Sequence, residues 1–197
     1  MSSHHIVRDE QEPALLLLEA SEHPSESILS LLEWSPTVVV ASTCLANVLA
    51  WGIKVDVVIG PKSEEHPLRE ALQEQYPVQL LCFEKPNYLE DAINYLLARK
   101  HKALNCIGGT INYQEPPPFE GLMQIVHLTD SFKAFWVADG HYEKWWRQGV
   151  LLAFEASPET QIQGLQNLGN GQWKTEADQL IHIRQPQGFW IKEPISI

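Results

Sequence analysis

Four short polar segments hold the residues of this sequence whose types could bind a ligand, and each segment directly follows an apolar run. Lysine ammonium groups can bind a phosphate or a carboxylate without a metal ion, and the backbone N–H groups of a glycine turn can surround an anion. Solvated surface lysines and a simple tight turn are plainer interpretations, and both stay open. The candidate ligand-binding residues are Ser42, Thr43, Lys62, Ser63, Lys85, Asn87, Gly108, Gly109 and Thr110.

The residue types give little indication of nucleophilic catalysis or of a metal site. Ser42 and Ser63 have no evident general base, so we expect no nucleophilic catalysis. Histidines are dispersed without the i,i+4 spacing of a zinc site on a helix, and we therefore predict no metal site. The histidines considered are His66, His101, His127 and His182.

The elements that must position the polar segments are apolar runs that alternate with helical patterns. Fully apolar strands separated by helices indicate a parallel sheet covered on both faces. Ligands bind such sheets at the carboxyl ends of the strands, so we expect the polar segments to meet at one edge. The expected strands are Leu15–Leu18, Thr37–Ala41, Val55–Ile59, Val78–Phe83 and Ala103–Ile107. The expected helices are Ser25–Leu32, Leu45–Trp51, His66–Gln75 and Leu89–Lys100.

The pattern changes after the consecutive prolines Pro116–Pro118, which form a stiff connector. Beyond them, short alternating runs and glycine turn signals predict an antiparallel β-sandwich. We therefore expect an α/β domain at residues 1–115 and a β-sandwich domain at residues 120–197. The expected strands of the second domain are Gln124–Leu128, Lys133–Asp139, Val150–Ala156, Leu180–Ile183 and Phe189–Lys192.

The composition excludes some partners. The 197 residues include 14 Lys and Arg and 25 Asp and Glu, for a net charge of −11, and such a surface repels nucleic-acid phosphates. The early apolar run Ala14–Leu18 is too short to span a bilayer and follows acidic residues, so we expect neither a membrane segment nor a signal peptide. Cys44, Cys82 and Cys106 lie in or beside apolar runs, which is typical of reduced core thiols in a cytoplasmic protein.

Aromatic side chains are concentrated in the second half. The turn signal Asp139-Gly140 leads into His141-Tyr142, with Trp145 and Trp146 close behind. These rings could stack on a flat ligand ring, or they could pack on the sandwich or on a second copy of the chain. Both interpretations stay open.

The stretch Ala41–Gly60 resembles the thiamine pyrophosphokinase family. That family has Ala-Asp-Gly-Gly-Ala, a helix, Gly-Ile-x-Pro-Asp, an apolar strand and Gly-Asp-Phe-Asp-Ser, and the spacing fits this sequence without a gap. The helix from Leu89 with the later Gly108-Gly109 turn, and Gly164–Gly169 with Trp173, also match the family framework. The resemblance covers nearly the whole chain.

The resemblance implies a homodimer that transfers pyrophosphate from ATP to thiamine with magnesium. It implies a nucleotide on the α/β domain, thiamine between that domain and the partner's β-domain, and dimerisation through the C-terminal domain.

This sequence departs from the family at the acidic residues that hold magnesium. Glu64, Glu65 and Asp91 lie close enough in sequence to replace a lost carboxylate. The fourth loop, Gly108–Tyr113, lacks the family's Arg-x-Asp. The family's aspartate positions are occupied by Ser42, Pro61, Ser63, Lys85 and Tyr88.

Magnesium needs carboxylates beside phosphate oxygens, and preorganised charge is usually the largest catalytic term. We therefore expect a catalytically impaired relative that requires no cofactor and retains small-ligand binding, for a nucleotide or a thiamine-like molecule. Two alternatives stay open: an active enzyme with a rebuilt site for magnesium and ATP, and a non-catalytic homodimeric interaction protein.

Overall fold

The structure is a computed structural model, and it describes residues 12–195. The chain divides into two compact units at the Gly109–Thr110 bond. Each unit has its own sheet arrangement and its own core.

Unit 1 is built on a parallel sheet. Its strands pair side by side in the order β5-β1-β2-β3-β4, with Leu15 opposite Val38 and Val57 opposite Gln79. The strands are β1 (Ala14–Leu17), β2 (Val38–Ala41), β3 (Val57–Pro61), β4 (Gln79–Phe83) and β5 (Ala103–Ile107).

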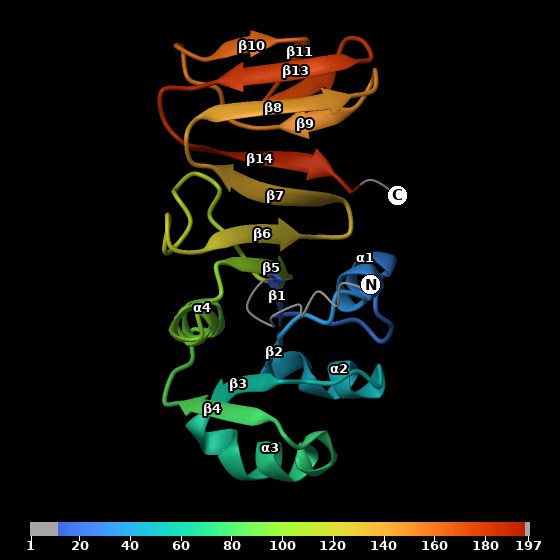
Figure 1. The fold of residues 1–197 in the computed structure, drawn as a ribbon, viewed down its shortest axis with the longest axis vertical. Helices are drawn as coiled ribbons and strands as arrows, with labels where there is room; N and C mark the ends of the chain where they lie inside the picture. Colours follow the sequence, from blue (N-terminus) through green and yellow to red (C-terminus); the bar gives the residue numbers. More distant parts are fainter. Residues whose placement is uncertain (1–11, 196–197) are drawn as a thin grey trace, which may run out of the picture. The chain divides into compact units, whose positions relative to one another are not determined.

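Helices cover both faces of this sheet (Figure 1). Leu15 and Leu17 pack in one cluster with side chains of α1, α2 and α3, while α4 contacts β1 and β3 through its buried Ala92, Ile93 and Leu96. Strands β1, β2 and nearly all of β3 are buried, which explains their continuous apolar runs, whereas β4 at the edge of the sheet is only partly buried. The helices are α1 (Glu26–Leu32), α2 (Leu45–Ala50), α3 (Glu65–Ala71) and α4 (Tyr88–Ala98), and the 3₁₀ turns are η1 (Ser42–Cys44), η2 (Lys62–Glu64) and η3 (Gln73–Gln75).

Unit 2 consists of two antiparallel sheets. One has the order β11-β12-β9-β14-β7-β6, and the other has the order β10-β13-β8. A core that includes Trp173, Ile181 and Ile191 draws on strands of both sheets. The strands are β6 (Gln124–Leu128), β7 (Phe132–Val137), β8 (His141–Trp146), β9 (Leu151–Ala153), β10 (Gln161–Gln163), β11 (Leu165–Gly169), β12 (Gln172–Thr175), β13 (Gln179–Arg184) and β14 (Phe189–Pro194).

The predicted fold class, a parallel α/β domain followed by an antiparallel β-sandwich, is confirmed. Several bounds differ from the prediction. The helix expected over His66–Gln75 ends at Ala71, and the strand expected to reach Asp139 ends at Val137. Strands β8, β10, β11 and β12 were missed because they are short or carry polar outward residues, which hides the apolar alternation. Cys82 is only partly buried, so it is not a core thiol.

Across the described residues, no helix is both long enough and apolar enough to cross a membrane.

Candidate functional site

The carboxyl edge of the unit 1 sheet brings Ser42 beside Gly60. Strands β2 and β3 run in register, with Ala41 opposite Ile59, and each continues directly into a 3₁₀ turn. A Cβ atom at Gly60 would lie 3.1 Å from the Ser42 Cβ and 2.6 Å from the Leu68 Cδ1. A larger residue at position 60 would therefore require the Leu68 and Ser42 side chains to move.

Tyr88, the first residue of α4, lies at the same edge of the sheet. Its hydroxyl lies 3.3 Å from the Ser42 hydroxyl, within hydrogen-bonding distance. Asn87 caps this helix, since its side chain accepts a hydrogen bond from the Glu90 N–H. The structure therefore joins Ser42 and Tyr88, two of the positions where the resemblance expects aspartates.

The lysines follow neighbouring strands but differ in their contacts. Pro61 is opposite Phe83 in the β3–β4 register, so Lys62 and Lys85 lie at the same edge. The Lys62 ammonium group lies 3.1 Å from the Glu84 carboxylate, and both groups are exposed. Thr43, Ser63 and Lys85 are exposed in the same region.

The Gly108-Gly109 turn faces a carboxylate of the chain itself. Both glycines have positive φ, and the Gly109 N–H donates a hydrogen bond to Glu19 Oε1 at 3.1 Å. An anion at this N–H would have to displace Glu19, a residue that the sequence analysis did not consider. Thr110, which the sequence placed in the same segment, belongs to unit 2, where it lines a cavity.

The carboxylates that could replace the missing aspartates have local partners. Glu65 Oε1 accepts hydrogen bonds from the Arg69 guanidinium at 2.7 and 3.1 Å. Asp91 Oδ2 accepts the Asn87 N–H at 2.8 Å. Glu64 is exposed beside them. These contacts stabilise the first turns of α3 and α4, where negative charge is favourable.

Cys44 lies in the turn after β2, next to the candidate residues. Burial raises the pKa of its thiol to about 11, and the thiol donates a hydrogen bond to the Leu17 carbonyl at 3.3 Å. A thiol with this pKa is protonated at neutral pH, so Cys44 is a packing residue and not a nucleophile.

Unit 2 contains a cavity of about 650 Å³ lined by aromatic and acidic side chains. The Trp136 and Trp190 rings meet edge to face at 6.0 Å, and their indole N–H groups donate to Glu120 and to the Glu115 carbonyl. The Trp190 side chain is almost completely buried, whereas that of Trp136 is partly exposed. The main lining residues are Tyr113, Trp136, Trp190, Phe189, Glu155 and Glu159.

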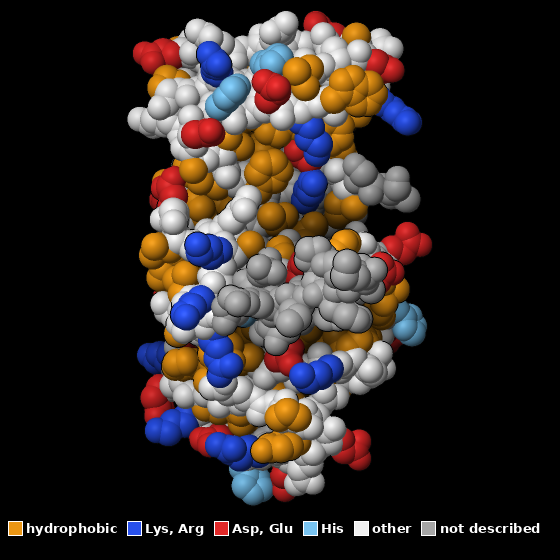
Figure 2. All heavy atoms as spheres, in the orientation of Figure 1, with side chains coloured by type: hydrophobic (Ala, Val, Ile, Leu, Met, Phe, Trp, Pro, Cys, Tyr) orange, Lys and Arg blue, Asp and Glu red, His pale blue; other side chains and the backbone are white. Residues whose placement is uncertain are grey.

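A second cavity of about 760 Å³ shares Tyr113, Glu155 and Trp190 with the first. The Lys192 ammonium group lies 3.9 Å from the Tyr113 ring centroid. Burial lowers the pKa of this lysine. Figure 2 shows hydrophobic side chains exposed on this unit among the charged ones.

The two units together define a class of protein: a parallel α/β unit followed by an antiparallel β unit with cavities lined by aromatic side chains. This is the fold of the thiamine pyrophosphokinases, and the predicted resemblance is confirmed at the level of the fold. No protein-family model and no curated protein sequence matches the chain.

Solved structures that share the fold come from bacteria and fungi. Thiamin pyrophosphokinase from Candida albicans matches with a TM-score of 0.68 at 9% identity, covering 94% of this chain and 90% of that one. Thiamine pyrophosphokinase from Bacillus subtilis matches with a TM-score of 0.63 at 9% identity, covering 94% and 100%. The yeast enzyme matches with a TM-score of 0.61 at 8% identity, covering 95% and 87%.

Proposed function

We propose that this chain is a small-molecule-binding protein built on the thiamine pyrophosphokinase fold, and that it does not transfer pyrophosphate from ATP to thiamine. The observation that carries the proposal is the contact between the Ser42 and Tyr88 hydroxyls. Two neutral side chains contact each other where the resemblance expects magnesium-binding carboxylates.

Charge supports the same conclusion. Phosphoryl-type transfer depends on metal ions and fixed charges that neutralise the transferred group. At this edge Lys62 pairs with Glu84, and Glu65 and Asp91 are bound to groups of their own helices. A metal ion would have to break these contacts to recruit two carboxylates.

The ligand we propose for unit 2 is a flat aromatic molecule with a positive charge, the class to which thiamine belongs. The partly exposed Trp136 ring can stack on such a ring and attract its charge. Glu155 and Glu159 line the same cavity and add negative charge. We also propose a homodimer through this unit, because Leu151 and Leu168 are large apolar side chains exposed on its surface.

The test is calorimetric titration with thiamine and with ATP, each with and without magnesium, together with an assay for thiamine diphosphate. We expect thiamine to bind without magnesium and no product to form. Trp136→Leu should weaken thiamine binding about tenfold or more, because base–aromatic stacking contributes about 1–3 kcal/mol per ring.

Trp34→Leu is the matched control, since Trp34 is an exposed tryptophan of unit 1 and should leave binding unchanged. ATP binding that needs magnesium, with formation of thiamine diphosphate, would overturn the proposal in favour of an active enzyme. Binding of neither molecule would overturn it in favour of an interaction protein, and light scattering tests the dimer separately.

A further inference from the structure

The outer face of the three-stranded sheet in unit 2 carries two imidazoles and a carboxylate side by side. His141 and Glu143 are two residues apart on β8, so they point to the same face of the strand. His182 on β13 is directly opposite Glu143 in the antiparallel register. All three side chains therefore project from one face, although two come from one strand and one from its neighbour.

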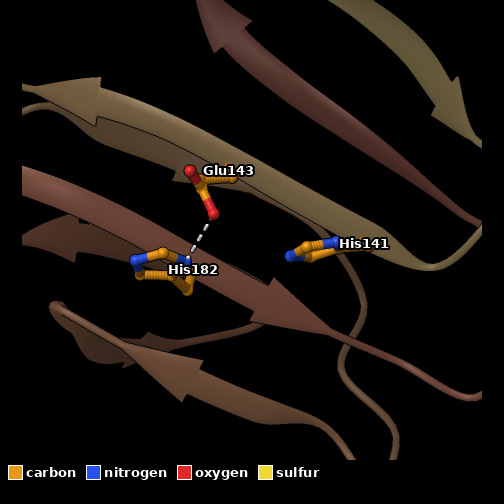
Figure 3. A group of neighbouring side chains, drawn as sticks. All are labelled: His141, Glu143 and His182. Carbon is orange, nitrogen blue, oxygen red and sulfur yellow. Dashed lines mark ion pairs between the residues drawn. The ribbon is translucent and has the colours of Figure 1, made fainter.

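The donor atoms of these residues are close together (Figure 3). His182 Nδ1 lies 3.0 Å from Glu143 Oε2, and one donor atom from each of the three residues lies within 4.8 Å of the others. The donor atoms of a tetrahedral zinc site, about 2.0–2.2 Å from the ion, are about 3.3–3.6 Å apart. The observed donor atoms, which lie 3.0 Å apart in one pair and no more than 4.8 Å apart in the others, would reach that geometry by side-chain rotation.

We propose that His141, Glu143 and His182 form a binding site for a divalent transition metal of the zinc class. Two imidazoles and one carboxylate are a typical donor set for zinc when a fourth position is left for water or a ligand. Nitrogen donors favour such a metal over magnesium or calcium, which prefer oxygen. The site lies within unit 2, shares no residue with the unit 1 edge, and does not depend on the proposed function.

The surroundings supply a possible fourth ligand and one opposing charge. The three residues line a hollow of about 430 Å³ together with Gln161, Gln163 and Arg184. Gln163 is opposite His182 in the β10–β13 register, which places an amide oxygen donor beside the site. Arg184 is opposite His141, and its positive charge weakens the binding of a cation here. Figure 2 shows histidine side chains beside an acidic one over the end of unit 2 that carries these strands.

The strands hold this face rigidly. Tyr142, Ile181 and Ile183 are buried on the opposite side of the same strands, so a slip in register would expose them. The backbone N–H of His141 donates to Asp139 Oδ1 at 3.0 Å, which fixes the start of β8. A site on such a base needs little rearrangement to bind an ion.

The experiment uses the full chain with His4→Ala and His5→Ala, because these adjacent imidazoles near the start of the sequence would add a second metal-binding site. The metal-free protein is titrated with zinc chloride in competition with a chromogenic chelator. We expect one zinc ion per chain. His182→Ala and Glu143→Gln should each weaken binding by about tenfold or more, since even residues that only support metal ligands typically contribute tenfold.

His66→Ala is the matched control, because His66 is an exposed histidine of α3 whose imidazole lies 3.9 Å from Glu70. It should leave the affinity unchanged, whereas Arg184→Gln should increase it. Cobalt substitution gives an independent readout: a visible absorption band that His182→Ala abolishes. The proposal is overturned if the protein does not compete with the chelator for zinc. It is also overturned if the His182→Ala and Glu143→Gln variants bind zinc as tightly as the parent protein does. Because the three residues lie at the surface, circular dichroism should show the variants folded.

Discussion

Two lysine–glutamate ion pairs show how differently the two units use charge. In unit 1, Lys62 and Glu84 meet at 3.1 Å with side chains that are 62% and 81% exposed. In unit 2, Lys144 and Glu193 meet at 2.7 Å, and the Glu193 side chain is completely buried. Exposed pairs contribute little to stability and exchange readily with solvent or ligands, whereas breaking a buried pair leaves an uncompensated charge.

Glu193 has partners at both carboxylate oxygens. Tyr142 donates to Oε1 at 2.7 Å, and Lys144 and Lys133 approach Oε2 at 2.7 and 3.3 Å. Burial, and then the Glu193 charge, raise the pKa of the Tyr142 phenol, so it stays protonated and donates. The inner face of β8 thus carries a structural network, and its outer face carries the proposed metal ligands. The charges at the edge of unit 1 can therefore be changed with little loss of stability, whereas the inner charges of unit 2 are part of its core.

The largest effect is expected for Glu193→Ala, which tests the contrast between the buried and the exposed ion pair. Removing one partner of a buried charge network costs about 3–5 kcal/mol, so the free energy of unfolding should fall by that amount. Urea unfolding followed by tryptophan fluorescence measures it. Glu84→Ala is the matched control in unit 1, with an expected loss below about 1 kcal/mol. Equal losses in the two variants would show that burial does not separate the two pairs.

A smaller effect is expected for Gly140→Ala at the turn into β8. Gly140 has a φ of 68°, and a Cβ atom there would lie 2.2 Å from the Gln185 carbonyl oxygen. The clash and the backbone strain should destabilise the protein by about 1–3 kcal/mol. Gly52→Ala is the control, because Gly52 has a φ of 70° with no atom within 4 Å of the added Cβ. If both variants lose the same stability in thermal unfolding, the close approach at Gly140 contributes nothing.

The smallest effect is expected for Lys62→Met. This change removes an exposed ion pair, so the free energy of unfolding should change by less than about 1 kcal/mol, and 1 M salt should abolish the difference by screening. Lys144→Met removes a partner of buried Glu193 and should cost clearly more, with little dependence on salt. Chemical unfolding at low and high salt compares them. If Lys62→Met lowers the free energy of unfolding equally at low and high salt, the Lys62–Glu84 pair contributes to stability, contrary to this prediction.

Unit 1 was easier to predict than unit 2. Strands β1, β2 and β3 are buried on both faces, so each appears in the sequence as a continuous apolar run, and glycines and prolines mark their ends. In unit 2, β8 has an outer face of His141, Glu143 and Trp145, which breaks the simple alternation of apolar and polar residues. The prediction of no metal site rested on the lack of helical i,i+4 histidine spacing, whereas the i,i+2 spacing of His141 and Glu143 on a strand is a signal for two ligands on one face.

By itself, the sequence determined the fold class, the polar segments after the strands, and the absence of aspartates at the positions where the resemblance expects them. These features depend on local composition and on the order of residues along the chain. Only the tertiary structure decided that Ser42 contacts Tyr88, that Glu19 binds the Gly109 N–H, and that His182 lies opposite Glu143. Such contacts join residues from about 40 to 90 positions apart, and strand register and helix placement determine them, not the spacing of residues along the chain.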